Sequence, residues 1–285
     1  MTTEKPTANA AEIENWNEGV GRSWVMLHER LDRQIEPIGH AAMAKAGFAP
    51  GQSVLDIGCG CGETTLEIAG RIAAGAVTGA DISALLLGVA RETATAKGVS
   101  NARFIQADAQ VHVFAPTAFD VVFSRFGVMF FEDPAAAFAN LRPALKPGGR
   151  LAFCCWRRPE ENVWLALPMQ VTRHLLPPLP PGDPNAPGPF AFADADRTRG
   201  FLQSAGFADI VFEPFDRRTG AEGLEDTVFM SMRVGQLGAA LRQVGATDEL
   251  KRSVVEALRE GLKDYLEDGA VKLPAAAWIV SARNP

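Results

Sequence analysis

The chain has 285 residues, 47% hydrophobic and 22% charged, which suits a globular protein with a buried core and excludes a disordered one. Its 28 basic and 34 acidic residues give a net charge of −6, which argues against a nucleic-acid partner because phosphate binding needs clustered Lys and Arg. No stretch is apolar for about 18 residues, so neither a transmembrane helix nor a membrane partner is expected.

The polar first residues carry no apolar signal-peptide core. Four cysteines lack the CxxC spacing of structural zinc: Cys59, Cys61, Cys154 and Cys155. We expect them to be reduced and buried, with no bound metal, in a cytoplasmic protein.

The N-terminal part of the chain is predicted to form a tail followed by helices. Residues 1–10 are expected to be disordered, and residues 11–46 to form lid helices. Apolar residues recur every three or four positions, as in an amphipathic helix, at Ile13, Trp16, Val20, Trp24, Leu27 and Leu31. A break is expected near Pro37, since proline lacks the N–H that a helix interior needs.

From residue 52 onward, short apolar strands alternate with helical segments. Strands are predicted at 53–57, 76–81, 102–106, 119–124 and 150–156, and helices at 62–72, 84–97 and 134–145. This alternation predicts an α/β fold with a doubly wound, mostly parallel sheet.

The pattern is less regular after Trp156. Residues 177–189 hold seven prolines and are predicted to form an irregular loop or lid. We expect a helix at 197–205, a strand at 209–215, a helical block at about 223–268 and a last strand at 275–282.

The most informative segment is the glycine-rich stretch Val54–Thr65, which follows a predicted strand and opens a helix. Gly58, Gly60 and Gly62 permit positive φ and let a ligand approach the backbone. In α/β folds, ligands bind beyond the carboxyl ends of the strands, so this loop predicts a nucleotide site.

The charges around this loop indicate which nucleotide it binds. A dinucleotide fingerprint needs glycine at relative positions 1, 3 and 6, but the sixth position from Gly58 is Glu63. Together with Asp56, this carboxylate repels a diphosphate and suits a ligand that carries an ammonium and a sulfonium. No Gly-Lys-Ser/Thr sequence follows, so the Walker pattern is absent. The residues therefore favour S-adenosylmethionine over NAD.

Two further carboxylates follow predicted strands. Asp81 ends the second strand and is placed to accept hydrogen bonds from ribose hydroxyls. Asp108, after the third strand, is placed to meet the adenine amino group. Ser124, Arg125 and Phe126 end the fourth strand and face the same cleft, where Arg125 is a candidate for binding an acidic group and Phe126 for packing against adenosine or substrate.

These motifs together resemble the class I S-adenosylmethionine-dependent methyltransferases, in particular the small-molecule group related to ubiquinone/menaquinone-biosynthesis C-methyltransferases. The matching segments are Val54–Gly62, Asp81-Ile82, Ala107–Ala109, Phe119–Ser124, Leu145–Leu151 and Ala205–Phe207. The resemblance implies a Rossmann-like seven-stranded sheet with an antiparallel last strand. It assigns residues 47–285 to the methyltransferase domain, with cover insertions at about 157–197 and 216–272.

The motifs and the resemblance together define the expected sites. The expected cofactor-binding residues are Asp56, Gly58, Gly60, Gly62, Asp81, Ile82, Asp108, Ala109, Ser124 and, on the lid helix, Trp24. The expected substrate-binding residues are Arg125, Phe126, Trp156 and Trp164. The apolar and aromatic lining that Phe126, Trp156 and Trp164 provide predicts a small hydrophobic or aromatic methyl acceptor.

The catalytic residues are not identified by any motif. His28 and His174 are the candidate general bases, although methyl transfer from a charged leaving group needs mainly alignment and desolvation. An NAD(P)-dependent oxidoreductase and a non-catalytic S-adenosylmethionine-binding module stay open as alternatives. The acceptor, the atom methylated and the oligomeric state, for which a homodimer is one option, are not specified by the sequence.

Overall fold

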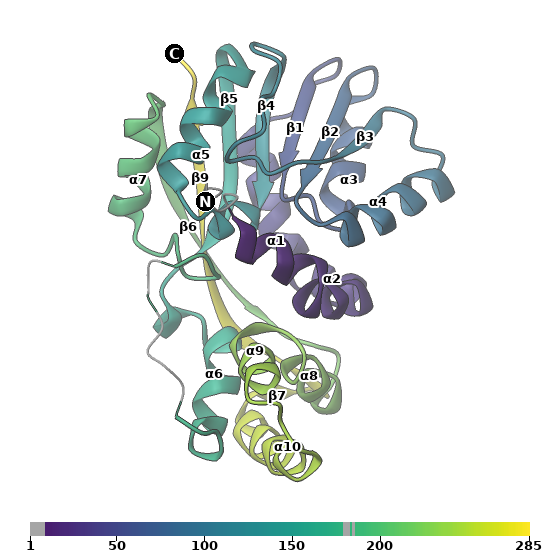
Figure 1. Ribbon diagram of the computed structural model, residues 1–285, viewed down its shortest axis with the longest axis vertical. Helices are drawn as coiled ribbons and strands as arrows, with labels where there is room; N and C mark the ends of the chain where they lie inside the picture. The colour runs from purple at the N-terminus through teal and green to yellow at the C-terminus, as the bar shows by residue number, and fades with distance from the viewer. Residues whose placement is uncertain (1–8, 179–182, 184–185) are drawn as a thin grey trace, which may run out of the picture.

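The computed structural model describes residues 9–178, 183 and 186–285, so most of the proline-rich segment between 179 and 185 lies outside the described residues. A seven-stranded sheet runs through the protein in the order β3-β2-β1-β4-β5-β9-β6 (Figure 1). Its strands are β1 (Ser53–Ile57), β2 (Ala76–Asp81), β3 (Ala102–Gln106), β4 (Phe119–Arg125), β5 (Leu145–Trp156), β6 (Ala208–Thr219) and β9 (Leu273–Arg283).

The first five strands pair in parallel, and β9 lies antiparallel between β5 and β6. The expected Rossmann-like α/β sheet with an antiparallel last strand is therefore confirmed. The central strands are buried on both sides, as in β1, where four of the five residues are buried, whereas the edge strands β3 and β6 are partly exposed.

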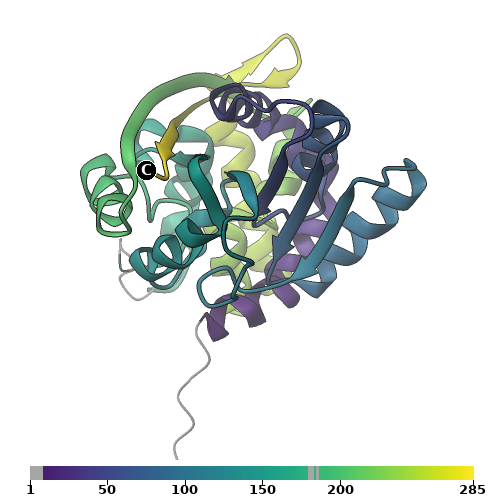
Figure 2. The ribbon, with the colours of Figure 1, turned by 90° about the horizontal axis from the view of Figure 1, so that it is seen from above.

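Helices cover both faces of the sheet (Figure 2). One face carries α2 (Gly19–Ala46), α3 (Glu63–Ile72) and α4 (Ala84–Ala96), and the other carries α5 (Pro134–Leu141) and α7 (Ala195–Ser204). This double winding brings the carboxyl ends of the parallel strands to one edge of the sheet, where α1 (Ala10–Asn17) lies.

The N-terminal helices differ from the prediction in two respects. The expected break near Pro37 is wrong, because α2 runs without interruption from Gly19 to Ala46. Buried residues on either side of the proline, Ile35 and Ile38, pack into the main hydrophobic core and hold the helix together. The chain breaks instead at Glu18, whose φ of −124° and ψ of −112° are not helical. Asn9 and Ala10, assigned to the tail, are described: Asn9 is buried, and Ala10 begins α1.

A cap lies beyond the edge of the sheet at which the parallel strands end (Figure 1). It consists of α6 (Val163–Thr172), α8 (Leu224–Ser231), α9 (Gly235–Gln243), α10 (Asp248–Leu262) and the hairpin of β7 (Leu266–Glu267) and β8 (Ala270–Val271). These elements share a second hydrophobic cluster, to which α10 contributes Val254, Leu258 and Leu262.

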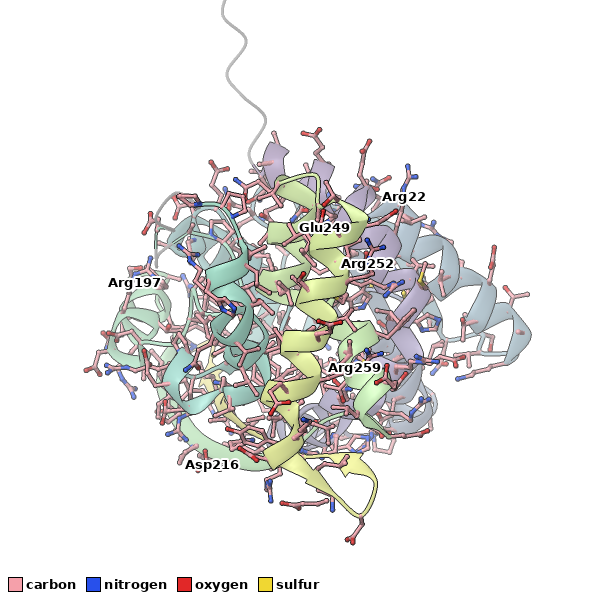
Figure 3. The ribbon with its side chains drawn as sticks, turned by 90° about the horizontal axis from the view of Figure 1, so that it is seen from below. Arg22, Arg197, Asp216, Glu249, Arg252 and Arg259 are labelled. Carbon is pink, nitrogen blue, oxygen red and sulfur yellow. The ribbon has the colours of Figure 1, made fainter. Side chains whose placement is uncertain are left out.

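The spacing of those three residues explains the orientation of α10, because positions four apart lie on one face of a helix. Its polar face carries Glu249, Arg252 and Arg259, which point outward in the view from below (Figure 3). The cap elements fall within the two segments that the sequence marks as insertions. Among the described helices, none combines the length and the apolar character needed to cross a membrane.

Close packing between β2 and its neighbours predicts that Gly79→Ala destabilises the protein. A Cβ at Gly79 would lie 2.8 Å from Thr65 Oγ1 and 2.9 Å from Cys59 Sγ. We expect a loss of about 1–3 kcal/mol in unfolding free energy, measured by urea denaturation. The control is Gly88→Ala within α4, where a Cβ meets nothing within 4 Å. That change should stabilise by about 0.4–1 kcal/mol. Equal stability of the two variants would contradict the packing described.

Candidate active site

The glycine loop joins β1 to α3 at the carboxyl edge of the sheet. Gly58, Gly60 and Gly62 have φ values of 65°, 55° and 90°, a region that glycine adopts without strain. A Cβ at Gly58 would come within 2.7 Å of Gly127 Cα, so the loop touches the segment after β4 through backbone atoms.

Asp81, at the end of β2, holds the glycine loop in place. Its Oδ2 accepts a hydrogen bond from the Gly60 N–H at 2.8 Å, and its Oδ1 accepts one from the Ser83 N–H at 2.9 Å. Burial raises the pKa of this carboxyl group, and the backbone N–H groups oppose the rise. The carboxylate therefore lies at the junction of two loops. Its neighbour Ile82 is bound through its carbonyl, which accepts from the side chain of Asn17.

Asp56 lies within β1 and is fully buried. Its Oδ2 accepts hydrogen bonds from the hydroxyls of Thr64 and Thr65, at 2.7 Å and 2.6 Å, while its Oδ1 has no partner. Burial raises the pKa of Asp56 to about 6 despite these hydroxyls. The residue connects β1 to the start of α3 and adds negative charge beneath the loop. Thr64 and Thr65, two and three positions after the third glycine, were the sequence signal for this contact, which had not been predicted.

Asp108, after β3, is engaged by a residue from the N-terminal segment. The Asn9 side-chain amide donates to both Asp108 oxygens at 2.8 Å and 2.9 Å, and the Gln110 N–H donates to Oδ1. Asn9 also exchanges two hydrogen bonds with Glu132. The next residue of the predicted adenine loop, Ala109, is buried, and its carbonyl accepts from the Asn140 amide.

Helix α1 is attached to the loop after β2. Ser83 Oγ donates to the Trp16 carbonyl at 2.7 Å, and the Ala84 N–H donates to Asn17 Oδ1 at 2.9 Å. Trp16 contacts both Trp24 and Phe130 edge to face. The predicted lid residue Trp24 thus belongs to an aromatic group between the N-terminal helices and the loop after β4.

The end of β4 carries three predicted site residues in different roles. The Ser124 hydroxyl donates to the Ile57 carbonyl and accepts from the Gly127 N–H, so Ser124 joins β4 to β1. Arg125 forms an ion pair with Asp32 of α2 at 2.5 Å. Phe126 adopts a left-handed conformation with φ of 64°, uncommon for a residue with a side chain.

An aromatic wall extends from Phe126 towards the cap. Its ring stacks on that of Trp156 with centroids 4.1 Å apart, and Trp164 of α6 contacts Trp156 edge to face at 5.1 Å. The structure therefore brings together three of the four predicted substrate residues. The fourth, Arg125, is neutralised by Asp32, which the sequence analysis did not single out although it lies four residues after His28 on the same helix.

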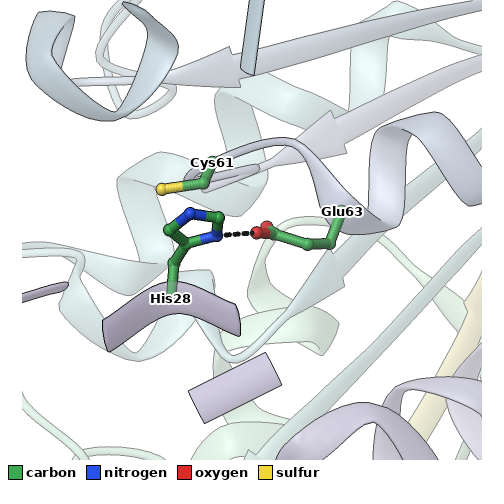
Figure 4. Close-up of side chains that lie close together, drawn as sticks. All are labelled: His28, Cys61 and Glu63. Atoms are coloured by element: carbon green, nitrogen blue, oxygen red, sulfur yellow. Dashed lines mark hydrogen bonds and ion pairs between the residues drawn. The ribbon is translucent and has the colours of Figure 1, made fainter. Parts of the chain in front are cut away.

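His28 lies against the glycine loop (Figure 4). Its Nδ1 is 2.7 Å from Glu63 Oε1, and ligand atoms of His28, Glu63 and Cys61 all lie within 4.8 Å of one another. Burial, together with the charges of nearby carboxylates, raises the pKa of Cys61 well above its usual range, so this thiol is protonated. The other candidate base, His174, is exposed on a turn of the cap, η4 (Arg173–Leu175).

The buried carboxyl of Asp56 predicts a specific pH dependence of stability. Its folded-state pKa of about 6 exceeds the ordinary value of 3.8, so the folded state binds more protons between these values. The contribution of Asp56 to stability should therefore fall as pH rises from about 4 to about 6, by about 3 kcal/mol in total. We expect the unfolding free energy of the ligand-free protein to decline over this range relative to Asp56→Asn. A constant difference between the two proteins would show that Asp56 ionises normally.

Comparison with known proteins agrees with this geometry. Residues 54–149 match a family model described as a methyltransferase domain. The ubiquinone/menaquinone biosynthesis C-methyltransferase UbiE of Shewanella halifaxensis is 37% identical over 120 residues, which is 41% of this chain and 48% of that protein. The protein of the same name from Teredinibacter turnerae is 36% identical over 164 residues, 55% of this chain and 66% of that protein. The chain thus spans about half the length of the first of these relatives and about two thirds of the second.

The fold is also similar to that of a solved methyltransferase. Phosphoethanolamine N-methyltransferase 2 of Haemonchus contortus, in complex with S-adenosyl-L-methionine, has a TM-score of 0.55 at 19% identity. The match covers 87% of this chain and 52% of that chain. The resemblance drawn from the sequence motifs is confirmed by these matches.

Proposed function

We propose, on the premise that this chain belongs to the class I S-adenosylmethionine-dependent methyltransferases, that it methylates a small hydrophobic or aromatic acceptor. The observation that carries the proposal is the glycine loop, which is hydrogen-bonded to Asp81 at the edge of the sheet and touches, through Gly127, the segment that carries the aromatic wall. When bound, S-adenosylmethionine supplies an electrophilic methyl group on a sulfonium.

The residues of the loop fit such a cofactor. Gly58, Gly60 and Gly62 would let it approach the backbone, and Asp81 would accept hydrogen bonds from its ribose hydroxyls. Asp56 has one oxygen without a partner, and together with Asp81 it makes the loop anionic, which suits a cationic ligand. Trp24 would face the cofactor from the lid, and Ser124 would hold the loop from β4.

The adenine end would lie by Asp108, Ile82 and Ala109. An adenine amino group and the Asn9 amide are both N–H donors, so they compete for the Asp108 carboxylate. We infer that Asn9 moves or shares this carboxylate when the cofactor binds. Closure of α1 over Ser83 and Ala84 would then exclude water from the site.

The acceptor would bind along Phe126, Trp156 and Trp164. The Asp32 carboxylate already neutralises Arg125, so an acidic group on the acceptor would have to displace it. This pairing favours an apolar acceptor over an acidic one. Alignment and exclusion of water by these residues would supply most of the rate enhancement.

His28 is a better candidate base than the exposed His174. A carboxylate that accepts from Nδ1–H leaves Nε2 of the imidazole free to take a proton. Glu63 would therefore orient His28 for an acceptor whose methylated atom must lose a proton.

The ribose assignment predicts that Asp81→Asn weakens S-adenosylmethionine binding by about 1–3 kcal/mol, the range for losing a charged hydrogen-bond partner. Isothermal titration calorimetry measures this change. Asp264→Asn, which alters an exposed carboxylate in the cap, is the control and should bind as the wild type does. Unchanged affinity in Asp81→Asn would refute the assignment.

The methyl-transfer activity predicts formation of S-adenosylhomocysteine when the protein is incubated with S-adenosylmethionine and a panel of aromatic and aliphatic acceptors. Mass spectrometry of the acceptor should show a gain of one methyl group. Tight NAD binding without S-adenosylmethionine binding would instead identify an oxidoreductase. Binding of S-adenosylmethionine with no turnover on any acceptor would identify a binding module.

A further inference from the structure

One buried hydrogen-bond donor stands out at the boundary between the sheet and the cap. Among the described residues, three buried side-chain atoms lack a hydrogen-bond partner, and only Trp164 Nε1 is a donor. The other two are carboxylate oxygens: that of Asp32 forms the ion pair with Arg125, and that of Asp56 has no partner. Native structures rarely keep a buried N–H unpaired, because its desolvation is not repaid by any bond.

The chain holds Trp164 firmly in its position. Asn162, two residues earlier, is fully buried, and its amide donates to the carbonyls of Arg157, Arg158 and Ala276. Its Oδ1 also accepts from the Ala276 N–H at 2.9 Å. Two of these bonds attach the start of α6 to β9, and the other two attach it to the segment after β5, so the indole is held on a rigid support.

The indole of Trp164 forms one end of the aromatic wall. Trp164 packs against both the main core and the hydrophobic cluster of the cap. Trp156 lies between it and Phe126, and Phe126 is followed by Gly127, whose backbone touches Gly58 of the glycine loop. A continuous path of contacts thus runs from the glycine loop to the unpaired N–H.

We propose that the Trp164 indole N–H donates a hydrogen bond to an oxygen atom of the bound acceptor. This inference rests on the proposed methyltransferase function and narrows its acceptor to a planar apolar compound that carries a carbonyl or hydroxyl oxygen. The aromatic wall supplies the apolar contact, and the N–H selects for the oxygen. A site with an unpaired buried N–H discriminates against analogues that lack the oxygen atom to which this N–H would donate.

The test uses 2-naphthol and 2-methylnaphthalene, which have similar shapes but differ in the oxygen. Protein labelled with ¹⁵N-tryptophan is loaded with S-adenosylhomocysteine, and the indole resonance of Trp164 is assigned from its proximity to Trp156. We expect 2-naphthol to move this resonance downfield and 2-methylnaphthalene to leave it nearly unchanged. Trp164→Phe should bind 2-naphthol about 5-fold more weakly and 2-methylnaphthalene equally well.

Trp278→Phe is the matched control, because the Trp278 indole N–H already donates to the Ala193 carbonyl. It should leave both affinities unchanged. An unmoved Trp164 resonance would show an N–H that only faces the Trp156 ring, and would overturn the proposal. Equal 2-naphthol affinity in the wild type and Trp164→Phe, or no binding of either probe, would overturn it as well. The wild-type resonance keeps the test decisive if Trp164→Phe is unstable.

Calorimetry with S-adenosylhomocysteine distinguishes a failure of the proposed methyltransferase function from a failure of the proposed role of Trp164. If S-adenosylhomocysteine does not bind, the proposed function itself fails. If it binds while the probes behave alike, only the role of Trp164 fails.

Discussion

The site depends on one carboxylate that receives N–H groups from two different loops. Asp81 accepts from Gly60 of the β1–α3 loop and from Ser83 of the β2–α4 loop, so it sets the separation of these loops. Its burial is unfavourable for the charge, and the two backbone donors offset that penalty. Helix α1 then attaches to the same place, because the Ser83 hydroxyl donates to Trp16. The glycine loop and helix α1 are therefore both hydrogen-bonded to the short segment that contains Asp81 and Ser83.

A second constraint joins the glycine loop to the aromatic wall of Phe126, Trp156 and Trp164. Gly58 and Gly127 touch through backbone atoms, and the Ser124 hydroxyl connects Ile57 to Gly127. The position of Phe126, and of the rings stacked beyond it, thus follows from backbone contacts that leave no room for a side chain. The cap has its own hydrophobic cluster, so its surface can vary without disturbing these contacts. This separation fits an enzyme class that combines one cofactor with many acceptors.

Polar and charged side chains attach the N-terminal segment and α2 to the edge of the sheet at which the parallel strands end. His28 and Asp32 lie one turn apart on α2. His28 hydrogen-bonds to Glu63, and Asp32 forms an ion pair with Arg125. Asn9 donates a hydrogen bond to Asp108. Asp108 and Arg125 were predicted to bind ligands, and nothing in the sequence indicated their protein partners. Asn9 and Asp108 are 99 positions apart, and no local pattern relates such residues. Each pairing depends on how α1 and α2 lie across the sheet.

Local chemistry in the chain determined the α/β fold, the glycine loop and the aspartate that ends β2. Apolar periodicity and glycine conformation act over a few residues, so they can be read without knowing the rest of the fold. The tertiary structure alone decided that α2 continues through Pro37, because packing of Ile35 and Ile38 outweighs the local effect of proline. It also decided that the cap forms a separate cluster and that Trp164 keeps an unpaired N–H. Those features arise from contacts between residues distant in the chain, which is why composition and spacing did not reveal them.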